Sequence, residues 1–204
     1  MSASIFNPRL ILASTSPYRR ELLQRLRVPF DVLSPGVDES PLPGEAPREL
    51  ALRLAIAKAE AVAGLHPDAV VLGSDQVCEL DGRPLGKPGD HARAVAQLRA
   101  LSGRSAHFLT AVAVVCRARN FAQADLAPVR VVFRTLAGDE IERYLQLDQP
   151  YDCAGSAKSE SLGIALLSSI DSDDPTALIG LPLIRTARLL REAGLDVLRD
   201  PEPA

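Results

Sequence analysis

A run of hydroxyl and basic side chains near the start of the chain has the residue types needed to bind an anion. It reads Ser14-Thr15-Ser16-Pro17-Tyr18-Arg19-Arg20 and follows the apolar segment Leu10-Ile11-Leu12-Ala13. Ser16 suits the N-cap of a helix, and Pro17 suits the first helical position, where a missing N–H costs nothing. A helix start carries free N–H groups and partial positive charge, to which this run adds three hydroxyls and two guanidinium groups. The run predicts a phosphate-binding turn; the alternative is an ordinary helix start with solvated arginines.

The elements that must hold this turn alternate between strand and helix patterns. An extended stretch is expected over residues 29–37, and a hairpin over 77–80 with its turn at Asp81-Gly82. Helices are expected over residues 48–63, 91–101, 139–147 and, interrupted near 180–182, 176–193. Strands are expected over 70–74, 108–116 and 129–134, with a polar surface connection between the last two.

This order predicts an α/β fold in which helices flank a mixed central sheet. No clean linker divides residues 1–204, so we expect a single domain of two lobes with the functional site in the cleft between them, and a frayed tail at 199–204. Residues 70–74 form an apolar run of strand length, followed by Asp75 and Gln76. We therefore expect these two polar groups at the carboxyl end of a central strand.

Composition excludes some classes of function. The 204 residues are 47% hydrophobic and 24% charged, and the net charge is −3, which gives no general attraction to nucleic acid or to a membrane surface. The apolar stretch within Met1–Ala13 is too short for a signal peptide, and no later segment approaches a membrane span. The expected location is the cytoplasm.

Neither the cysteines nor the clustered acids predict a metal site by themselves. Cys78, Cys116 and Cys153 lack the paired spacings of structural zinc or of disulfides, so buried free thiols are expected, with a reactive Cys153 as the less favoured alternative. Asp171, Asp173 and Asp174 lack the ligand spacing of a calcium loop, and Asp174-Pro175 has the pattern of a turn and helix cap.

Several ordered motifs closely resemble the Maf family of nucleotide pyrophosphatases over nearly the full length. They are Ala13–Arg20, Asp38-Glu39, Lys58 within Arg53–Ala59, Gly73–Val77, Gly86-Lys87-Pro88, Asp152–Glu160 and Ile179–Leu183. The resemblance implies a Maf/ITPase-like fold and a metal-dependent hydrolase that splits a nucleoside triphosphate between its α and β phosphates. The substrate would then be a small nucleotide rather than a nucleic acid.

Three of the motifs resemble the YceF-type branch of the family, which is associated with hydrolysis of 7-methyl-GTP to 7-methyl-GMP and pyrophosphate. They are Ser-Pro-Tyr ending at Tyr18, Asp-Gln-Val-Cys from Asp75, and Lys-Ser-Glu ending at Glu160. Two alternatives stay open. One is activity on another nucleotide, such as dTTP, UTP or a different modified triphosphate. The other is a non-catalytic nucleotide-binding regulator of cell division.

The resemblance assigns roles to residues of this chain. Asp75 would be the proton acceptor, and Glu39 with Asp75 would bind a divalent cation, Mg²⁺ or Mn²⁺, whose preferred ligands are carboxylate oxygens. Asp38 is a further candidate ligand. The phosphate chain would be bound by residues from several elements: Ser14, Ser16, Arg20, Lys58 and Lys87.

Base selection would fall to Tyr18, Gln76 and Glu160. A guanine methylated at N7 carries positive charge, so an aromatic face and a carboxylate suit it. We expect Tyr18 to lie near the base, with stacking on the cationic ring left open; the alternative is helix packing beside Leu22. We expect Glu160 to accept hydrogen bonds from guanine N–H groups and Gln76 to contact the remaining edge. The apolar helices also leave room for a homodimer, although no heptad pattern requires one.

Overall fold

The computed structural model describes residues 8–198, and the tail expected at 199–204 lies outside them. The strands are β1 (Leu10–Ala13), β2 (Phe30–Leu33), β3 (Val70–Leu80), β4 (Arg83–Leu85), β5 (Ser105–Cys116), β6 (Phe121–Phe133) and β7 (Leu167–Asp171). The α-helices are α1 (Pro17–Gln24), α2 (Pro47–Ala63), α3 (His91–Leu101), α4 (Gly138–Asp148) and α5 (Leu183–Glu192). Short 3₁₀ turns occupy Arg117–Arg119, Ala154–Ser156, Leu162–Leu166 and Ala177–Ile179.

The strands form one mixed sheet in the order β2-β1-β3-β5-β6-β7, with β4 paired to β3. Strands β2, β1 and β3 are parallel, whereas the pairs from β3 through β5 and β6 to β7 are antiparallel. The expected mixed α/β sheet flanked by helices is therefore confirmed, as is the hairpin that joins β3 to β4.

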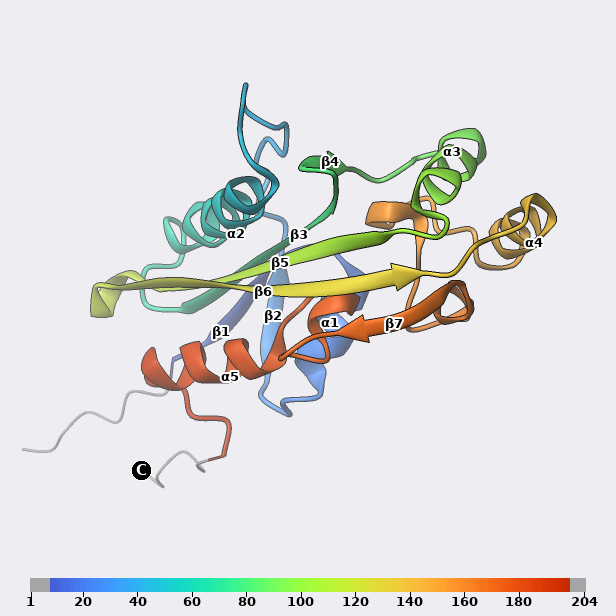
Figure 1. Ribbon diagram of the computed structural model, residues 1–204. Coiled ribbons are helices and arrows are strands. Elements are labelled where there is room, and N and C mark those ends of the chain that lie inside the picture. Colours follow the sequence, from blue (N-terminus) through green and yellow to red (C-terminus); the bar gives the residue numbers. More distant parts are fainter. Residues whose placement is uncertain (1–7, 199–204) are drawn as a thin grey trace, which may run out of the picture.

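Alternate side chains of β3 face two different sets of helices. Its odd-numbered apolar residues, such as Val71, pack with α2, and its even-numbered ones, such as Leu72, pack with α1 and α5. Farther along the even face, Cys78 and Leu80 pack with α3 and α4. Figure 1 shows α2 and α5 on opposite sides of the long strands, with α3 and α4 gathered toward the other end of the same sheet. One sheet thus runs through both groups of helices.

One edge of β3 is left open in its middle. On the side away from β5, β1 pairs with Val70–Leu72 and β4 pairs with Cys78–Leu80. Within the described part of the chain, no strand pairs with this edge over residues 73–77. Because β1 ends at Ala13 and β4 begins only after the hairpin, a gap opens in the sheet beside Asp75 and Gln76.

A glycine brings α2 close to this gap. A Cβ built on Gly73 would lie 2.3 Å from the carbonyl oxygen of Ala55 and 2.6 Å from the amide nitrogen of Ala59. Only a residue without a side chain allows the helix backbone to approach the strand so closely. Lys58 lies between those two α2 residues, so this contact brings it next to Asp75, two residues after Gly73.

The sequence-based boundaries differ most from the structure in two places, while smaller differences occur at β2 and at the start of β5. β3 does not end at Ser74 but continues to Leu80, because antiparallel pairing with β5 extends past Asp75, whose partner is Ala111. The expected surface connection after Cys116 is only a short 3₁₀ turn, and β6 already begins at Phe121. Its first residues, Phe121–Asp125, are largely exposed and mix small, polar and aromatic types without a clear strand pattern, which is why their sequence resembled a loop. The edge strand β7 was not predicted.

The C-terminal helix is interrupted where Gly180-Leu181-Pro182 predicted a break, and α5 begins after it. Asp174 is fully buried and accepts a hydrogen bond from the amide of Arg185, in the first turn of α5, at 3.1 Å. Asp173 contacts the same arginine at 3.0 Å. These acids therefore cap and fix a helix, as their sequence pattern predicted.

Candidate active site

A cavity of about 510 Å³ opens at the gap in the sheet. Its wall combines the turn after β1, the loop between β2 and α2, one face of α2, the middle of β3 and the β4–α3 connection. The lining residues that bear on the argument are Ser14, Thr15, Ser16, Arg19, Ser34, Glu39, Lys58, Asp75, Gln76, Lys87 and Ala154. Seven of these residues were predicted as site residues, namely Ser14, Ser16, Glu39, Lys58, Asp75, Gln76 and Lys87, and the gap in the sheet is what brings them together.

Lys58 is the buried centre of the charged part of this cavity. Only 4% of the residue is exposed, and its Nζ lies 2.7 Å from Oδ1 of Asp75 and 2.6 Å from Oε1 of Glu39. Helix α2 supplies Lys58, β3 supplies Asp75, and the loop between β2 and α2 supplies Glu39. Since a buried ammonium needs compensating charge, the two carboxylates neutralise it and are held close together by it.

Arg19 reaches the same carboxylate from the opposite face of the sheet. Its Nη2 lies 4.0 Å from Oδ1 of Asp75, and its Nε donates a hydrogen bond to the carbonyl oxygen of Gly180 at 2.9 Å. Burial lowers the pKa of the Arg19 guanidinium, while the charges of Asp75 and Glu39 act in the opposite direction. The cavity therefore contains an ammonium and a guanidinium brought together through the gap.

The structure places Arg20 away from this cavity. Arg20 is exposed and lines a separate hollow between α1 and β2, so the prediction that it binds the phosphate chain is not supported by its position. The sequence contained a signal for Arg19 instead. Arg19 precedes Leu22 and Leu23 by three and four residues, the spacing that places it on the buried face of the helix, and both leucines are buried.

The turn between β1 and α1 has the predicted capping geometry. Ser16 Oγ accepts a hydrogen bond from the Arg19 amide at 3.4 Å, and Pro17 opens the helix. Ser14 Oγ accepts from the Ser16 amide at 3.2 Å. Both hydroxyls keep a hydrogen to donate, so the turn presents donors to the cavity beside the ammonium of Lys58.

A second ion pair fixes the loop that carries Glu39. Arg53 on α2 donates from Nε and Nη2 to the two carboxylate oxygens of Glu45, at 2.5 and 2.8 Å, and from Nη2 to the carbonyl of Ser40. The Arg53 hydrogen bond lowers the pKa of Glu45 to about 2 despite desolvation. This bidentate pair therefore holds the loop against α2 at neutral pH.

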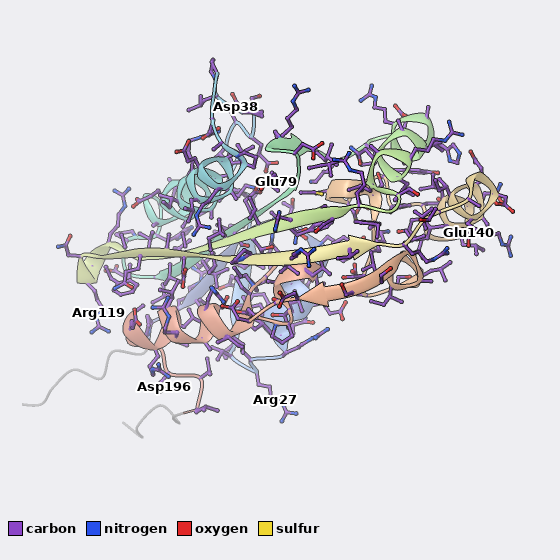
Figure 2. The ribbon with its side chains drawn as sticks, in the orientation of Figure 1. Arg27, Asp38, Glu79, Arg119, Glu140 and Asp196 are labelled. Atoms are coloured by element: carbon purple, nitrogen blue, oxygen red, sulfur yellow. The ribbon has the colours of Figure 1, made fainter. Side chains whose placement is uncertain are left out.

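Glu39 and Asp38 occupy different positions in that loop. Desolvation would raise the pKa of the Glu39 carboxyl, but the hydrogen bond and charge of Lys58, helped by Lys87 and Arg19, outweigh it and lower the pKa. Asp38 instead accepts a hydrogen bond from the Ser40 amide and lies at the outer part of the loop beyond α2 (Figure 2). Glu39 is thus the acid of this pair that lines the cavity.

Tyr18 lies beside the cavity in a polar cluster with the segment that follows α4. Its hydroxyl donates to Oδ2 of Asp152 at 3.3 Å, and the Nζ of Lys158 lies 5.8 Å from its ring centroid and 3.7 Å from Oδ1 of Asp152. Desolvation raises the pKa of Tyr18 to about 12, so the phenol is a donor at neutral pH. Ala154 continues this segment into the cavity wall.

The other two residues predicted to select the base differ in their surroundings. Gln76 lines the cavity, but its Nε2 group is bonded to Thr110 Oγ1 and to the carbonyls of Ala177 and Leu178, at 2.9, 2.9 and 3.0 Å. Only its amide oxygen is left for a ligand. Glu160 is exposed beside the Tyr18 cluster, and desolvation raises the pKa of its carboxyl, with the charge of Lys158 opposing the rise.

The three cysteines are free, and Cys78 and Cys116 are buried as expected. Cys153 is half-buried, with its Sγ 3.9 Å from the Tyr18 hydroxyl. Desolvation raises the pKa of the Cys153 thiol to about 12, which keeps it protonated and argues against the reactive alternative.

The acids of the cavity fit a divalent cation that also binds phosphate. Within residues 8–198, no three His, Cys, Asp or Glu side chains gather into a complete protein ligand set. Lys58 contacts one oxygen of Glu39 and one of Asp75, which leaves the second oxygen of each carboxylate for a cation. One or two carboxylates completed by phosphate oxygens and water is the donor set that Mg²⁺ prefers.

Sequence reasoning missed two parts of the wall. One is Arg19, discussed above. The other is the stretch from Ser34 to Val37 after β2, which lines the cavity because β2 ends in register with β1. Residues after a short edge strand carry no chemical signature in the sequence.

Residues 8–198 also contain no helix with the length and apolar character that a membrane crossing needs.

Comparison with known proteins gives a consistent result over most of the chain. Residues 9–193 match the Maf family, described as Maf-like protein. A 7-methyl-GTP pyrophosphatase of Polaromonas sp. (strain JS666) is 66% identical over 191 residues, which cover 94% of this chain and 87% of that protein. One of Albidiferax ferrireducens is 66% identical over 190 residues, covering 93% and 96%. Among solved structures, the Staphylococcus aureus Ham1 protein aligns with 61% of this chain and 71% of its own, at 19% identity and a TM-score of 0.45. The chain belongs to the Maf family.

Proposed function

We propose that this protein is a metal-dependent nucleoside triphosphate pyrophosphatase that converts 7-methyl-GTP and water into 7-methyl-GMP and pyrophosphate. The observation that carries the reaction type is the buried group in which Lys58 contacts both Asp75 and Glu39 while Arg19 approaches Asp75. A carboxylate suited to accept a proton lies there beside cations suited to bind phosphate, which supports this reaction type. The names of the relatives, each a 7-methyl-GTP pyrophosphatase, support the choice of nucleotide.

The proposed reaction is a displacement at the α-phosphorus. A water molecule attacks that atom and gives its proton to Asp75, while the bond between the α-phosphorus and the oxygen that bridges to the β-phosphorus breaks. The electron pair of that bond leaves with pyrophosphate. Arg19, Lys58 and Lys87 are proposed to neutralise the phosphate charge, and Ser14 and Ser16 to donate hydrogen bonds to phosphate oxygens.

A divalent cation, Mg²⁺ or Mn²⁺, fits the free oxygens of Glu39 and Asp75. When bound, it would supply charge neutralisation at the phosphates. The residues of the chain keep separate tasks: Lys58 holds the two carboxylates near each other, and the Arg53–Glu45 pair holds the loop that carries Glu39.

The base would lie toward the Tyr18 cluster. A 7-methylguanine ring is cationic, and this end of the site offers the Tyr18 ring together with the carboxylates of Asp152 and Glu160. Lys158 carries a positive charge there but is paired with Asp152. Gln76 is proposed to contribute through its amide oxygen, because its nitrogen is engaged elsewhere.

The test is a panel of nucleotides. We expect pyrophosphate release from 7-methyl-GTP to have the highest kcat/KM among 7-methyl-GTP, GTP, dTTP and UTP, measured with Mg²⁺ and with Mn²⁺ and abolished by a chelator. A preference for dTTP or UTP would overturn the choice of base. Binding of nucleotides without any pyrophosphate release would favour the regulator instead. We propose the cytoplasm as the location of this activity, and the homodimer stays a prediction.

The two neighbouring arginines give a paired test of the phosphate site. We expect Arg19→Ala to weaken binding of inorganic triphosphate at least about tenfold, because it removes charge-assisted hydrogen bonds from a buried position. Arg20→Ala should change the affinity by less than about twofold, since Arg20 lies outside the cavity. Isothermal titration calorimetry measures both. A larger loss in the Arg20 variant would reverse the assignment.

Glu160 gives a test of base selection. We expect Glu160→Gln to lower kcat/KM for 7-methyl-GTP about tenfold, because a hydrogen bond to an ionised acceptor is replaced by a neutral one. Affinity for inorganic triphosphate should stay unchanged. Glu21→Gln, an exposed carboxylate on α1, is the matched control. Unchanged kcat/KM for 7-methyl-GTP in the Glu160 variant would remove this residue from the site.

A further inference from the structure

The segment between β7 and α5 is hydrogen-bonded to the sheet through its main-chain carbonyls. Thr110 Oγ1, on β5, donates to the carbonyl of Ala177 at 2.8 Å. Gln76 Nε2, on β3, donates to the carbonyls of Ala177 and Leu178 and to Thr110 Oγ1. Thr110 is fully buried and does not line the cavity. Side chains from two strands therefore fix the position of a segment that carries no catalytic side chain of its own.

The same segment is fixed on its other side by α5. Thr176 Oγ1 donates to the carbonyl of Leu181 at 2.8 Å and accepts from the amide of Leu183 at 2.9 Å. Asp174 accepts from the amide of Arg185 in the first helical turn. With contacts to the sheet on one side and to α5 on the other, the carbonyls in between have little freedom to move.

One of those carbonyls orients the arginine of the cavity. The carbonyl oxygen of Gly180 accepts the hydrogen bond from Arg19 Nε at 2.9 Å and lies 3.2 Å from Ser74 Oγ, on β3. Gly180 has a φ of 127°, a backbone conformation that residues with side chains rarely adopt. Because Nε is occupied, the two terminal nitrogens of Arg19 are left for the cavity, with Nη2 near Asp75.

We infer that Thr110 is a positioning residue for the phosphate chain, acting through the Ala177–Gly180 segment on Arg19. Removal of its hydroxyl frees one attachment of the segment, loosens the Gly180 carbonyl and leaves the guanidinium less well aimed. The inference rests on the proposed function for the identity of the ligand. The buried hydroxyl of Thr110 then has a role in orienting Arg19 in addition to its role in the stability of the core. The Gln76 nitrogen belongs to the same hydrogen-bond network.

A purely structural role would produce a different pattern, so the test is a double-mutant cycle. Thr110→Val and Thr110→Ser are compared in the wild-type chain and in Arg19→Lys. The matched control is Thr186→Val, because Thr186 is equally buried and, among residues 8–198, its Oγ1 has no hydrogen-bond partner. The measurements are the Kd of inorganic triphosphate, kcat and KM for 7-methyl-GTP and GTP, and Tm.

We expect Thr110→Val to weaken triphosphate binding about fivefold, the effect of one hydrogen bond, and to lower kcat/KM for both nucleotides by the same factor. Thr110→Ser should restore wild-type values within about twofold, and Thr186→Val should leave them unchanged. In the Arg19→Lys background, Thr110→Val should add no further loss. A full fivefold loss in that background, or a changed ratio between the nucleotides, would overturn the inference.

A second variant and a second measurement keep the test of Thr110 decisive. If Thr110→Val does not fold, Ser74→Ala tests the same path, because Ser74 is also fully buried, lies outside the cavity wall and contacts the Gly180 carbonyl. If the wild-type protein releases pyrophosphate from neither nucleotide, the proposed function fails. Triphosphate binding in the same variants still decides whether Thr110 acts through Arg19.

Discussion

Asp75→Asn should lower kcat for 7-methyl-GTP by about 100- to 10,000-fold, the range that loss of a general base produces. Asparagine keeps the shape of the side chain and an oxygen for Lys58, but that oxygen cannot accept a proton from water. The Kd of inorganic triphosphate should change little or improve, since one negative charge near the phosphates is lost. Single-turnover release of pyrophosphate and calorimetric binding measure the two effects separately.

Glu79→Gln is the control for this variant. Glu79 lies on the same strand, four residues beyond Asp75 and outside the cavity wall (Figure 2), and its substitution makes the same change of charge and atoms. We expect its kcat to match the wild type. A kcat for Asp75→Asn within about tenfold of wild type, with an unchanged Tm, would show that another group accepts the proton.

Lys58→Met should have the second largest effect, lowering kcat/KM by about 100-fold or more. The substitution keeps the length of the side chain but leaves the carboxylates of Glu39 and Asp75 close together without the ammonium between them. Two such groups repel each other, and phosphate binding loses a cation. Triphosphate affinity and pyrophosphate release should therefore both fall, unlike in Asp75→Asn.

The pH dependence gives this variant a separate signature. Lys58 contributes most of the lowering of the Glu39 pKa, against desolvation that raises it. Without the lysine the pKa must rise, so Glu39 takes up a proton at a higher pH and the acid limb of the kcat/KM profile should move to higher pH. Arg48→Met removes an exposed charge from the same helix and serves as the control. An acid limb at the wild-type pH would show that ionisation of Glu39 is not required for activity.

The helix start after β1 could be predicted because its information is local. A hydroxyl at the N-cap and a proline after it specify a helix start, and the structure has Ser16 and Pro17 in those positions. The helix α3 was also predicted with its observed limits, since Asp90 caps a clear amphipathic pattern. Such features depend on residues a few positions apart.

The position of Asp75 could not be predicted in this way, because it depends on pairing between strands far apart in sequence. The apolar run ends at Ser74, so the sequence pattern indicates a strand end, whereas antiparallel partners on β5 carry the strand on to Glu79 and pairing with β4 carries it to Leu80. Helix periodicity could have shown that Arg19, and not Arg20, lies on the buried face of the helix. The hydrogen bonds of the Gln76 nitrogen could not be predicted, since two of its three partners lie about one hundred residues away.

The gap beside β3 also bears on how the protein avoids unwanted association. A free strand edge is a template onto which another chain can add, and proteins protect such edges by keeping them short or by placing charges beside them. This edge spans residues 73–77 between the ends of β1 and β4, and Lys58 and Arg19 lie on its two sides. It is too short and too highly charged for a foreign strand. We therefore expect this edge, which no strand within residues 8–198 pairs, to resist the addition of another polypeptide while leaving room for a small molecule.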